Sequence, residues 1–321
     1  MRFVYLDTNV YNALSSRLSD TQVTALPEVL DQLGIEVLIS PVNILEILAS
    51  SERPRKERLV WVAQHLAAPP ILPEVESIVI DYAARIVKDP RVEHLRLRRP
   101  TARPPLREEW EKVYNDKRRT LHISEESIRA LMMMKKVNAL HHAITSRGLF
   151  EGTDWQFDLR GLSGGNLRVV LEDVTSRMRS IQPPTDRAAF YQQNVALVTA
   201  IILCIGLTPF PEPIDDFWNA LGRHKVEDRL DFVWQEHPEL YLDGPVVGLS
   251  HLLWWQSQRA FDRGNLFDAY HLQYLQVVSE FLTKDAALLE YGAGCAAGSR
   301  PRENMRDACD FIDMVVAAIG E

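Results

Sequence analysis

The chain has 321 residues, of which 46% are hydrophobic and 25% are charged, and its formal net charge at pH 7 is −8. This length suits one large domain or two modest ones, and the composition is that of a globular protein. The negative net charge excludes a general attraction to nucleic acid or anionic lipid, so any such contact requires a local basic patch.

The cysteines and the apolar segments indicate the compartment. Three cysteines without C-x-x-C spacing argue against a zinc knuckle or a disulfide framework, and they fit a reducing environment. The longest apolar run, residues 195–207, has 13 residues, fewer than the roughly 20 that cross a bilayer. The N-terminus is typical of a strand rather than a signal peptide. We therefore expect a cytoplasmic protein with no membrane partner.

The first stretch predicts a strand over residues 3–6 that ends in Asp7, Thr8 and Asn9. Helices are expected over residues 10–18, 24–33, 56–66 and 74–87, and a second strand over residues 35–39. Ser40 and Pro41 predict the N-cap and first residue of another helix, in which Glu46 interrupts an otherwise apolar run. Glu46 is either on a solvated face or part of a site.

The segment 85–120 contains 12 Lys and Arg against 6 Asp and Glu, and several of its basic residues lie among prolines. This composition predicts a mobile basic loop. Such a run is either simply solvated or a grip on a phosphate backbone. The candidate nucleic-acid-binding residues are Arg96, Arg98, Arg99, Arg103, Lys117, Arg118 and Arg119.

Residues 90–245 are expected to form a mostly α-helical insertion that begins with the basic segment. Helices are predicted over residues 167–179, 186–207, 214–221, 225–235, 246–263 and 302–319, and a strand over residues 279–283. Asp268 opens a helix, where capping is the ordinary role of an acid. Asp285 follows the strand, as Asp7 follows the first one.

Four acids therefore stand at strand ends or on helices: Asp7, Glu46, Asp268 and Asp285. If they converged at the carboxyl edge of a sheet, they would repel one another unless a cation neutralised them. Mg²⁺ and Mn²⁺ suit such oxygen ligands. Two such ions roughly 4 Å apart would activate a water and stabilise the leaving oxygen of a phosphodiester. The histidines show no metal-ligand spacing, and no P-loop or G-x-S-x-G motif occurs.

These motifs resemble those of PIN-domain nucleases. The resemblance is carried by Tyr5-Leu6-Asp7-Thr8-Asn9, the helix with Glu46, Asp268-Ala269-Tyr270-His271-Leu272, and Phe281-Leu282-Thr283-Lys284-Asp285. It covers residues 1–89 and 246–321, and implies a discontinuous three-layer α/β/α domain with a central, mainly parallel sheet. It also implies that the four acids are catalytic ligands of Mg²⁺ or Mn²⁺, supported by hydrogen bonds from Asn9 and Thr283. The expected last strand of the family is not visible in residues 291–300.

The sequence thus predicts a metal-dependent endoribonuclease, a hydrolase that leaves a 5′-phosphate and a 3′-hydroxyl. Many proteins of the family are toxins, so a protein antitoxin is a possible partner besides the RNA substrate. Two alternatives remain open. One is a PIN-like module that binds RNA or protein without cutting, and the other is a nuclease for structured DNA.

Overall fold

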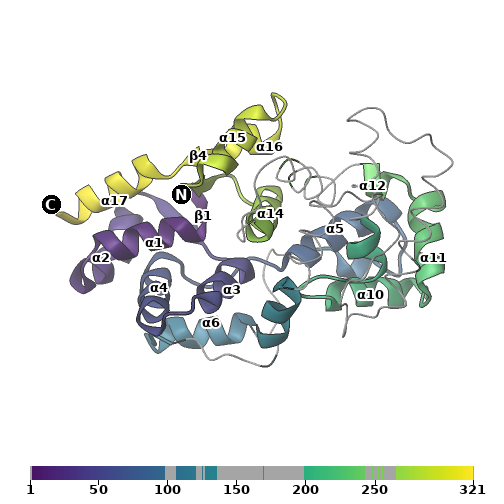
Figure 1. Cartoon of the computed structure of the whole chain (residues 1–321), viewed down its shortest axis with the longest axis horizontal. Helices are drawn as coiled ribbons and strands as arrows, with labels where there is room; N and C mark the ends of the chain where they lie inside the picture. The colour runs from purple at the N-terminus through teal and green to yellow at the C-terminus, as the bar shows by residue number, and fades with distance from the viewer. Residues whose placement is uncertain are drawn as a thin grey trace, which may run out of the picture. The chain divides into compact units, whose positions relative to one another are not determined.

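The computed structural model describes residues 2–97, 106–120, 127–135, 199–242 and 265–320, and single residues at 125, 169, 248, 252 and 255. The chain divides into two compact units (Figure 1). Unit 1 contains residues 1–74, 99–131 and 270–321, and unit 2 contains residues 75–98 and 132–269. The chain therefore passes from one unit to the other after residues 74, 98, 131 and 269, whereas the sequence placed two boundaries, after residues 89 and 245.

Unit 1 is built on a four-stranded sheet in the order β2-β1-β3-β4, and every neighbouring pair is parallel. The strands are β1 (Arg2–Leu6), β2 (Ile35–Leu38), β3 (Phe281–Thr283) and β4 (Met305–Asp307). The predicted α/β class with a parallel sheet is confirmed. Because parallel strands end at the same edge, the residues that follow β1, β2 and β3 come together there.

The two central strands are buried where they approach the carboxyl edge of the sheet, whereas Arg2 and Phe3 at the start of β1 are exposed. Tyr5 and Leu6 in β1 and Phe281 in β3 are fully buried, which is typical of strands inside a parallel sheet. Tyr5 lies in register with Phe281 on one side and with Leu38 of β2 on the other. Residues far apart in the sequence therefore complete one sheet.

The helices of unit 1 pack around this sheet and against one another. They are α1 (Thr8–Arg17), α2 (Asp20–Gln32), α3 (Pro41–Ala49), α4 (Arg53–Leu66), α6 (Leu106–Asn115), α15 (Ala286–Gly294), α16 (Arg300–Asn304) and α17 (Cys309–Gly320). Helices α1 and α2 both contact α4 and α17, while α15 contacts α16 and β4. This arrangement is consistent with a three-layer α/β/α fold. Helix α14 (Asn265–Gln273) crosses the dividing point between the units.

The predicted start of α3 is confirmed in detail. Ser40 is the N-cap and forms a capping box, in which its hydroxyl accepts from the Asn43 N–H and the Asn43 side chain accepts from the Ser40 N–H. The turn before β2 also follows the sequence. Gly34 has φ +65°, a left-handed conformation that a side chain would strain, so a glycine ends the α2 region.

The predicted helix over residues 302–319 is wrong in its first part. Helix α16 ends at Asn304, residues Met305–Asp307 form the edge strand β4, and α17 begins only at Cys309. Only Met305 of this strand is buried, and Arg306 and Asp307 are exposed. Such a short edge strand lacks the apolar alternation that marks a strand in a sequence. The sheet thus has a fourth strand that the sequence did not reveal.

The basic segment is not the continuous mobile loop that its composition suggested. Helix α5 runs to Val87, a short 3₁₀ helix covers Glu93–Leu95, and α6 begins at Leu106. Trp110 and Val113 of α6 are fully buried, and this burial of an amphipathic face stabilises the helix despite its many charges. Residues 98–105 lie outside the described residues.

The regular secondary structure in the described part of unit 2 is helical. It contains α5 (Val75–Val87), a 3₁₀ helix (Glu93–Leu95), α10 (Glu212–Leu221), α11 (Val226–Asp231), α12 (Glu239–Leu242) and two π-helical turns (Ala200–Cys204 and Phe232–Glu236). The helices predicted over residues 167–179 and 246–263, apart from single residues, and most of the one over 186–207, lie outside the described residues. No helix in the described part of the chain is long and apolar enough to cross a membrane.

Candidate metal centre

Asp7 stands where β1 ends and α1 begins. Its backbone N–H donates to the Leu282 carbonyl of β3, and its carbonyl accepts from the Val10 N–H at the start of α1. Its carboxylate does not cap the helix. Instead, Oδ2 accepts from the Thr283 hydroxyl at 2.6 Å and from the Asn9 amide at 2.7 Å. The two residues predicted to support the acids therefore both bind Asp7.

Asp7 is only 4% exposed. Burial raises its pKa above the usual value, and the nearby Glu46 raises it further, while His271 and the hydrogen bonds from Thr283 and Asn9 lower it. A buried carboxylate with two donors on one oxygen is held firmly in place. Its other oxygen, Oδ1, lies 4.0 Å from Nε2 of His271.

Glu46 reaches the same place from α3. Asn43, one turn earlier, donates to the Leu6 carbonyl at 3.0 Å and to the Thr8 hydroxyl at 3.3 Å. These bonds attach the first turn of α3 to the end of β1, so that a side chain one turn further on lies over the sheet edge. The Glu46 side chain is 24% exposed, and its Oε2 lies 2.9 Å from Nε2 of His271.

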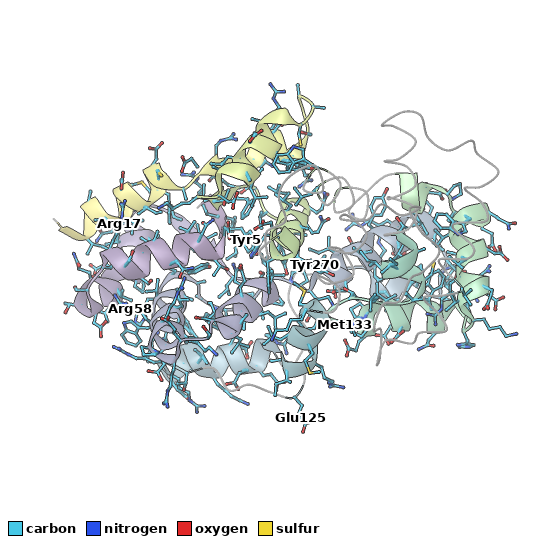
Figure 2. All side chains as sticks on the ribbon, in the orientation of Figure 1. Tyr5, Arg17, Arg58, Glu125, Met133 and Tyr270 are labelled. Atoms are coloured by element: carbon cyan, nitrogen blue, oxygen red, sulfur yellow. The ribbon has the colours of Figure 1, made fainter. Side chains whose placement is uncertain are left out.

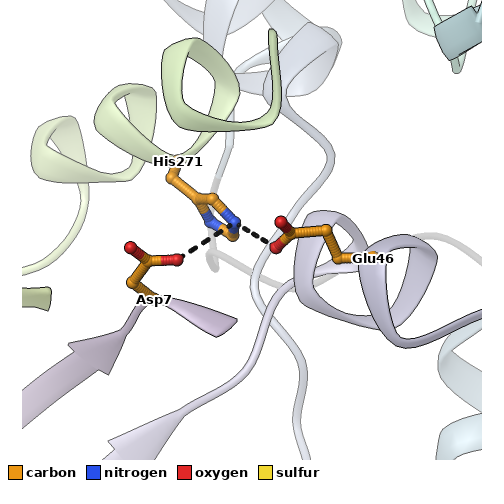
Figure 3. A group of neighbouring side chains, drawn as sticks. All are labelled: Asp7, Glu46 and His271. Atoms are coloured by element: carbon orange, nitrogen blue, oxygen red, sulfur yellow. Dashed lines mark hydrogen bonds and ion pairs between the residues drawn. The ribbon is translucent and has the colours of Figure 1, made fainter. Parts of the chain in front are cut away.

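His271 projects from α14 between the two acids, as Figure 3 shows. Its side chain is fully buried. Burial lowers the pKa of the imidazole, but the hydrogen bond and the charge of Glu46, together with the charge of Asp7, outweigh this effect and leave the pKa above its usual value. The other ring nitrogen, Nδ1, lies 2.5 Å from the hydroxyl of Tyr5.

One possible ligand atom each from Asp7, Glu46 and His271 lies within 4.8 Å of the others. Two carboxylates and an imidazole form a donor set that suits a divalent transition ion such as Mn²⁺. A second indication comes from Tyr11 of α1, whose buried hydroxyl lacks a hydrogen-bond partner among the described residues. Tyr11 is fully buried near Asp7, whose charge adds to burial in raising the Tyr11 pKa. The residues present therefore fit a metal ion.

The other two predicted acids have different surroundings. Asp285 is the N-cap of α15, where its carboxylate accepts from the Leu288 N–H at 2.9 Å. Its own N–H donates to the Thr283 hydroxyl at 2.9 Å, so it is linked to Asp7 through one shared side chain. Asp268 lies on α14 one turn before His271. Neither acid belongs to the group of three.

The described candidates for nucleic-acid binding already have partners. Arg96 pairs with Glu93 and Arg118 with Asp116, both at 2.5 Å. Arg119 pairs with Asp20 at 2.7 Å and lies 4.3 Å above the Trp61 ring, and Lys117 lies above the Tyr114 ring. Arg58, labelled in Figure 2, also binds Asp20. The remaining candidates, Arg98, Arg99 and Arg103, lie outside the described residues.

His271 is the member of the site that sequence reasoning missed. The histidines lack the short spacings of zinc motifs, and His271 has no neighbour at such a spacing. Its position three residues after Asp268 was the available signal, because residues three apart lie on the same side of a helix.

No protein-family model, no curated protein and no solved structure matches the chain.

Proposed function

We propose that the chain is a metal-dependent endoribonuclease with a PIN-like catalytic domain in unit 1. The observation that carries the proposal is the group Asp7, Glu46 and His271 at the carboxyl edge of the parallel sheet, with ligand atoms within 4.8 Å of one another. These three residues would hold Mg²⁺ or Mn²⁺. Asp268, which shares α14 with His271, and Asp285, which shares Thr283 with Asp7, are proposed to complete the acidic set.

The bound ion would activate a water for in-line attack on the phosphodiester and stabilise the leaving oxygen. The protein's own contribution is to position the ligands. Thr283 and Asn9 both donate to one oxygen of Asp7 and leave the other directed toward His271. Asn43 fixes the start of the helix that carries Glu46. The burial of Asp7 and His271 limits exchange with solvent, which strengthens charge interactions at the site.

The proposed substrate is single-stranded RNA, with the basic segment 85–120 as the phosphate contact and an antitoxin-like protein as a possible partner. The order of the motifs along the chain supports the resemblance to PIN-domain nucleases, since Asp7 follows β1 and Thr283-Lys284-Asp285 begins at the last residue of β3, its neighbour in the sheet. Structured DNA is the alternative substrate for the same site. Parallel assays with RNA and DNA at one salt concentration distinguish the two, since binding to phosphates depends on salt in both cases.

The test is cleavage of end-labelled single-stranded RNA by the full chain, with Mn²⁺, with Mg²⁺ and with EDTA. We expect metal-dependent cleavage that Asp7→Asn lowers by more than about 100-fold, the upper end of what even outer partners of a metal ligand cost. Asp310→Asn is the matched control, because Asp310 is exposed on α17. Equal cleavage by wild type and Asp7→Asn, at equal purity, would show that the site is assigned wrongly.

One observation favours the second candidate, a non-catalytic binding module. A protonated His271 would neutralise part of the charge of Glu46 and Asp7 without any ion, and the 2.9 Å contact with Glu46 is a good hydrogen bond for it. Under this alternative, neither RNA nor DNA is cleaved with any divalent ion. Thermal stabilisation by Mn²⁺ without cleavage would favour a metal-binding module that does not cut.

A further inference from the structure

We infer that His271 binds the ion directly through Nε2, that a buried hydrogen-bond chain from Tyr5 to Asn43 holds it in the required tautomer, and that this nitrogen makes the site prefer Mn²⁺ to Mg²⁺. The inference rests on the proposed metal-dependent function and specifies which ion the site takes. Tyr5, Ser40 and Asn43 are positioning residues in it, because they act on the ion only through His271.

The hydrogen-bond chain from His271 to Asn43 is continuous, and its side chains are buried. The Tyr5 hydroxyl lies 2.5 Å from Nδ1 of His271 and 2.7 Å from Oγ of Ser40. Oγ of Ser40 lies in turn 3.1 Å from Oδ1 of Asn43. Ser40 and Asn43 are fully buried, as is Tyr5, so water does not compete for these groups.

The backbone fixes the orientation of the Asn43 amide. Its nitrogen faces the Leu6 carbonyl, which can only accept, and its oxygen faces the Ser40 N–H, which can only donate. Oδ1 is therefore an acceptor for the Ser40 hydroxyl as well. The Ser40 oxygen already accepts from the Asn43 N–H at 3.2 Å. The Asn43 amide therefore sets the direction in which the hydroxyl groups of the hydrogen-bond chain donate.

Starting from Asn43, each hydroxyl can donate in one direction. Ser40 donates to Asn43, Tyr5 donates to Ser40, and the Tyr5 oxygen then accepts from Nδ1–H of His271. In this arrangement every group in the chain keeps a partner, and the lone pair of Nε2 faces Glu46 and Asp7. A lone pair beside two carboxylates requires a cation between them. An ion bound through Nε2 would replace the proton that Nε2 shares with Glu46 at 2.9 Å, and it would leave the bonds from Nδ1 to Asn43 intact. Metal-binding histidines commonly have such a partner on the second nitrogen.

The Nε2 nitrogen of His271 affects which metal ion the site prefers. Mg²⁺ favours oxygen ligands and keeps several waters, whereas imidazole suits transition ions, and affinities for mixed N/O sites rise from Mn²⁺ onward along the first row. A site with two carboxylates and one imidazole therefore discriminates against Mg²⁺ more than an all-carboxylate site does. Replacing His271 by glutamine would supply a neutral oxygen in its place and would reduce this discrimination.

The experiment is pulsed electron paramagnetic resonance of the full wild-type chain with one equivalent of Mn²⁺, at natural abundance and with ¹⁵N-labelled histidine. We expect a coupling from a directly bound nitrogen that changes with the label and is absent in His271→Gln. We also expect Mg²⁺ to displace Mn²⁺ from His271→Gln at a lower ratio than from wild type. Tyr5→Phe should weaken Mn²⁺ binding about 10–100-fold and alter the nitrogen signal.

Tyr274→Phe is the matched control for Tyr5→Phe. Its ring lies 4.9 Å from the Tyr5 ring, but its hydroxyl is outside the chain that leads to His271, so we expect an unchanged nitrogen signal. Mn²⁺ that binds, is lost in Asp7→Asn and shows no nitrogen coupling in wild type would overturn the inference and leave the proposed metal site standing. A wild-type chain that binds no Mn²⁺ would overturn both. If Tyr5→Phe has the Mn²⁺ affinity and the nitrogen signal of wild type, the hydrogen-bond chain does not hold His271 in its tautomer.

Discussion

Replacing Thr283 by valine tests how firmly Asp7 is held. The substitution keeps the β-branched shape that suits β3 and removes only the hydroxyl. That hydroxyl donates to Asp7 at 2.6 Å, and it accepts from the Asp285 N–H at 2.9 Å and the Asn9 amide at 3.2 Å. Thr283 is fully buried, so water does not replace the lost partner.

The expected loss follows from these bonds. A hydrogen bond to a charged group contributes about 1.5–3 kcal/mol, and a neutral one contributes about 0.5–1.5 kcal/mol. We discount the Asn9 bond, because Asn9 still donates to Asp7 at 2.7 Å. Thr283→Val should therefore lower the free energy of unfolding of unit 1 by about 2–4 kcal/mol, a large part of the roughly 5–15 kcal/mol typical of a domain.

The assay is urea-induced unfolding with EDTA present, together with hydrogen exchange of the β1 and β3 amides, which reports on unit 1 alone. Thr24→Val is the matched control, since Thr24 is exposed on α2 and bonds only a backbone carbonyl; we expect a change within about 0.5 kcal/mol. If both variants lose equally little, and β1 exchanges as in wild type, Thr283 does not hold Asp7 and the reasoning fails.

Three further predictions concern the helix cap, the pH dependence and the basic residues. Ser40→Ala and Ser19→Ala each remove a capping-box hydroxyl and should each cost about 0.5–2 kcal/mol in urea unfolding, but only Ser40→Ala should weaken Mn²⁺ binding in calorimetry. With EDTA, the raised pKa of His271 stabilises the fold below pH 6.5, and this contribution is lost as the pH rises through the folded pKa. The free energy of unfolding of His271→Gln should lack this component of the pH dependence. An identical pH dependence in wild type and His271→Gln would contradict the prediction. On the proposed RNA contact, Asp20→Asn, which releases Arg119, should raise affinity for single-stranded RNA in filter binding, and Arg119→Ala should lower it; equal affinities would exclude this residue from the interface.

Short sequence patterns predicted those parts of the fold that depend only on adjacent residues. The strand before Asp7, the stop at Gly34 and the cap at Ser40 each follow from a few adjacent residues, and all three are present. Strand β4 was missed because only Met305 of its three residues is buried. What identifies it as a strand is its pairing with β3, a contact that the sequence of residues 305–307 does not encode by itself.

The candidate site shows the same division. Asp7 and Glu46 were predicted from their places after a strand and within an apolar helix, and the structure brings them to one edge of the sheet. His271 was not, because its role depends on three partners, Tyr5, Glu46 and Asp7, that lie at least 225 residues away in the sequence. Apart from Asp268, one turn earlier, nothing near residue 271 marks these contacts. A histidine becomes part of such a site through the fold rather than through spacing.

The same geometry explains why a histidine, rather than another acid, stands between Asp7 and Glu46. Buried carboxylates repel one another, and a further carboxylate in place of His271 would make the fold without an ion costly. An imidazole can carry a proton on Nε2 when no ion is bound. It would release that proton to solvent if an ion took its place, because the Tyr5–Ser40–Asn43 hydrogen-bond chain satisfies Nδ1 in either case. The three residues thus remain paired with or without the ion. Under the proposed function, this pairing allows the site to fold before an ion binds.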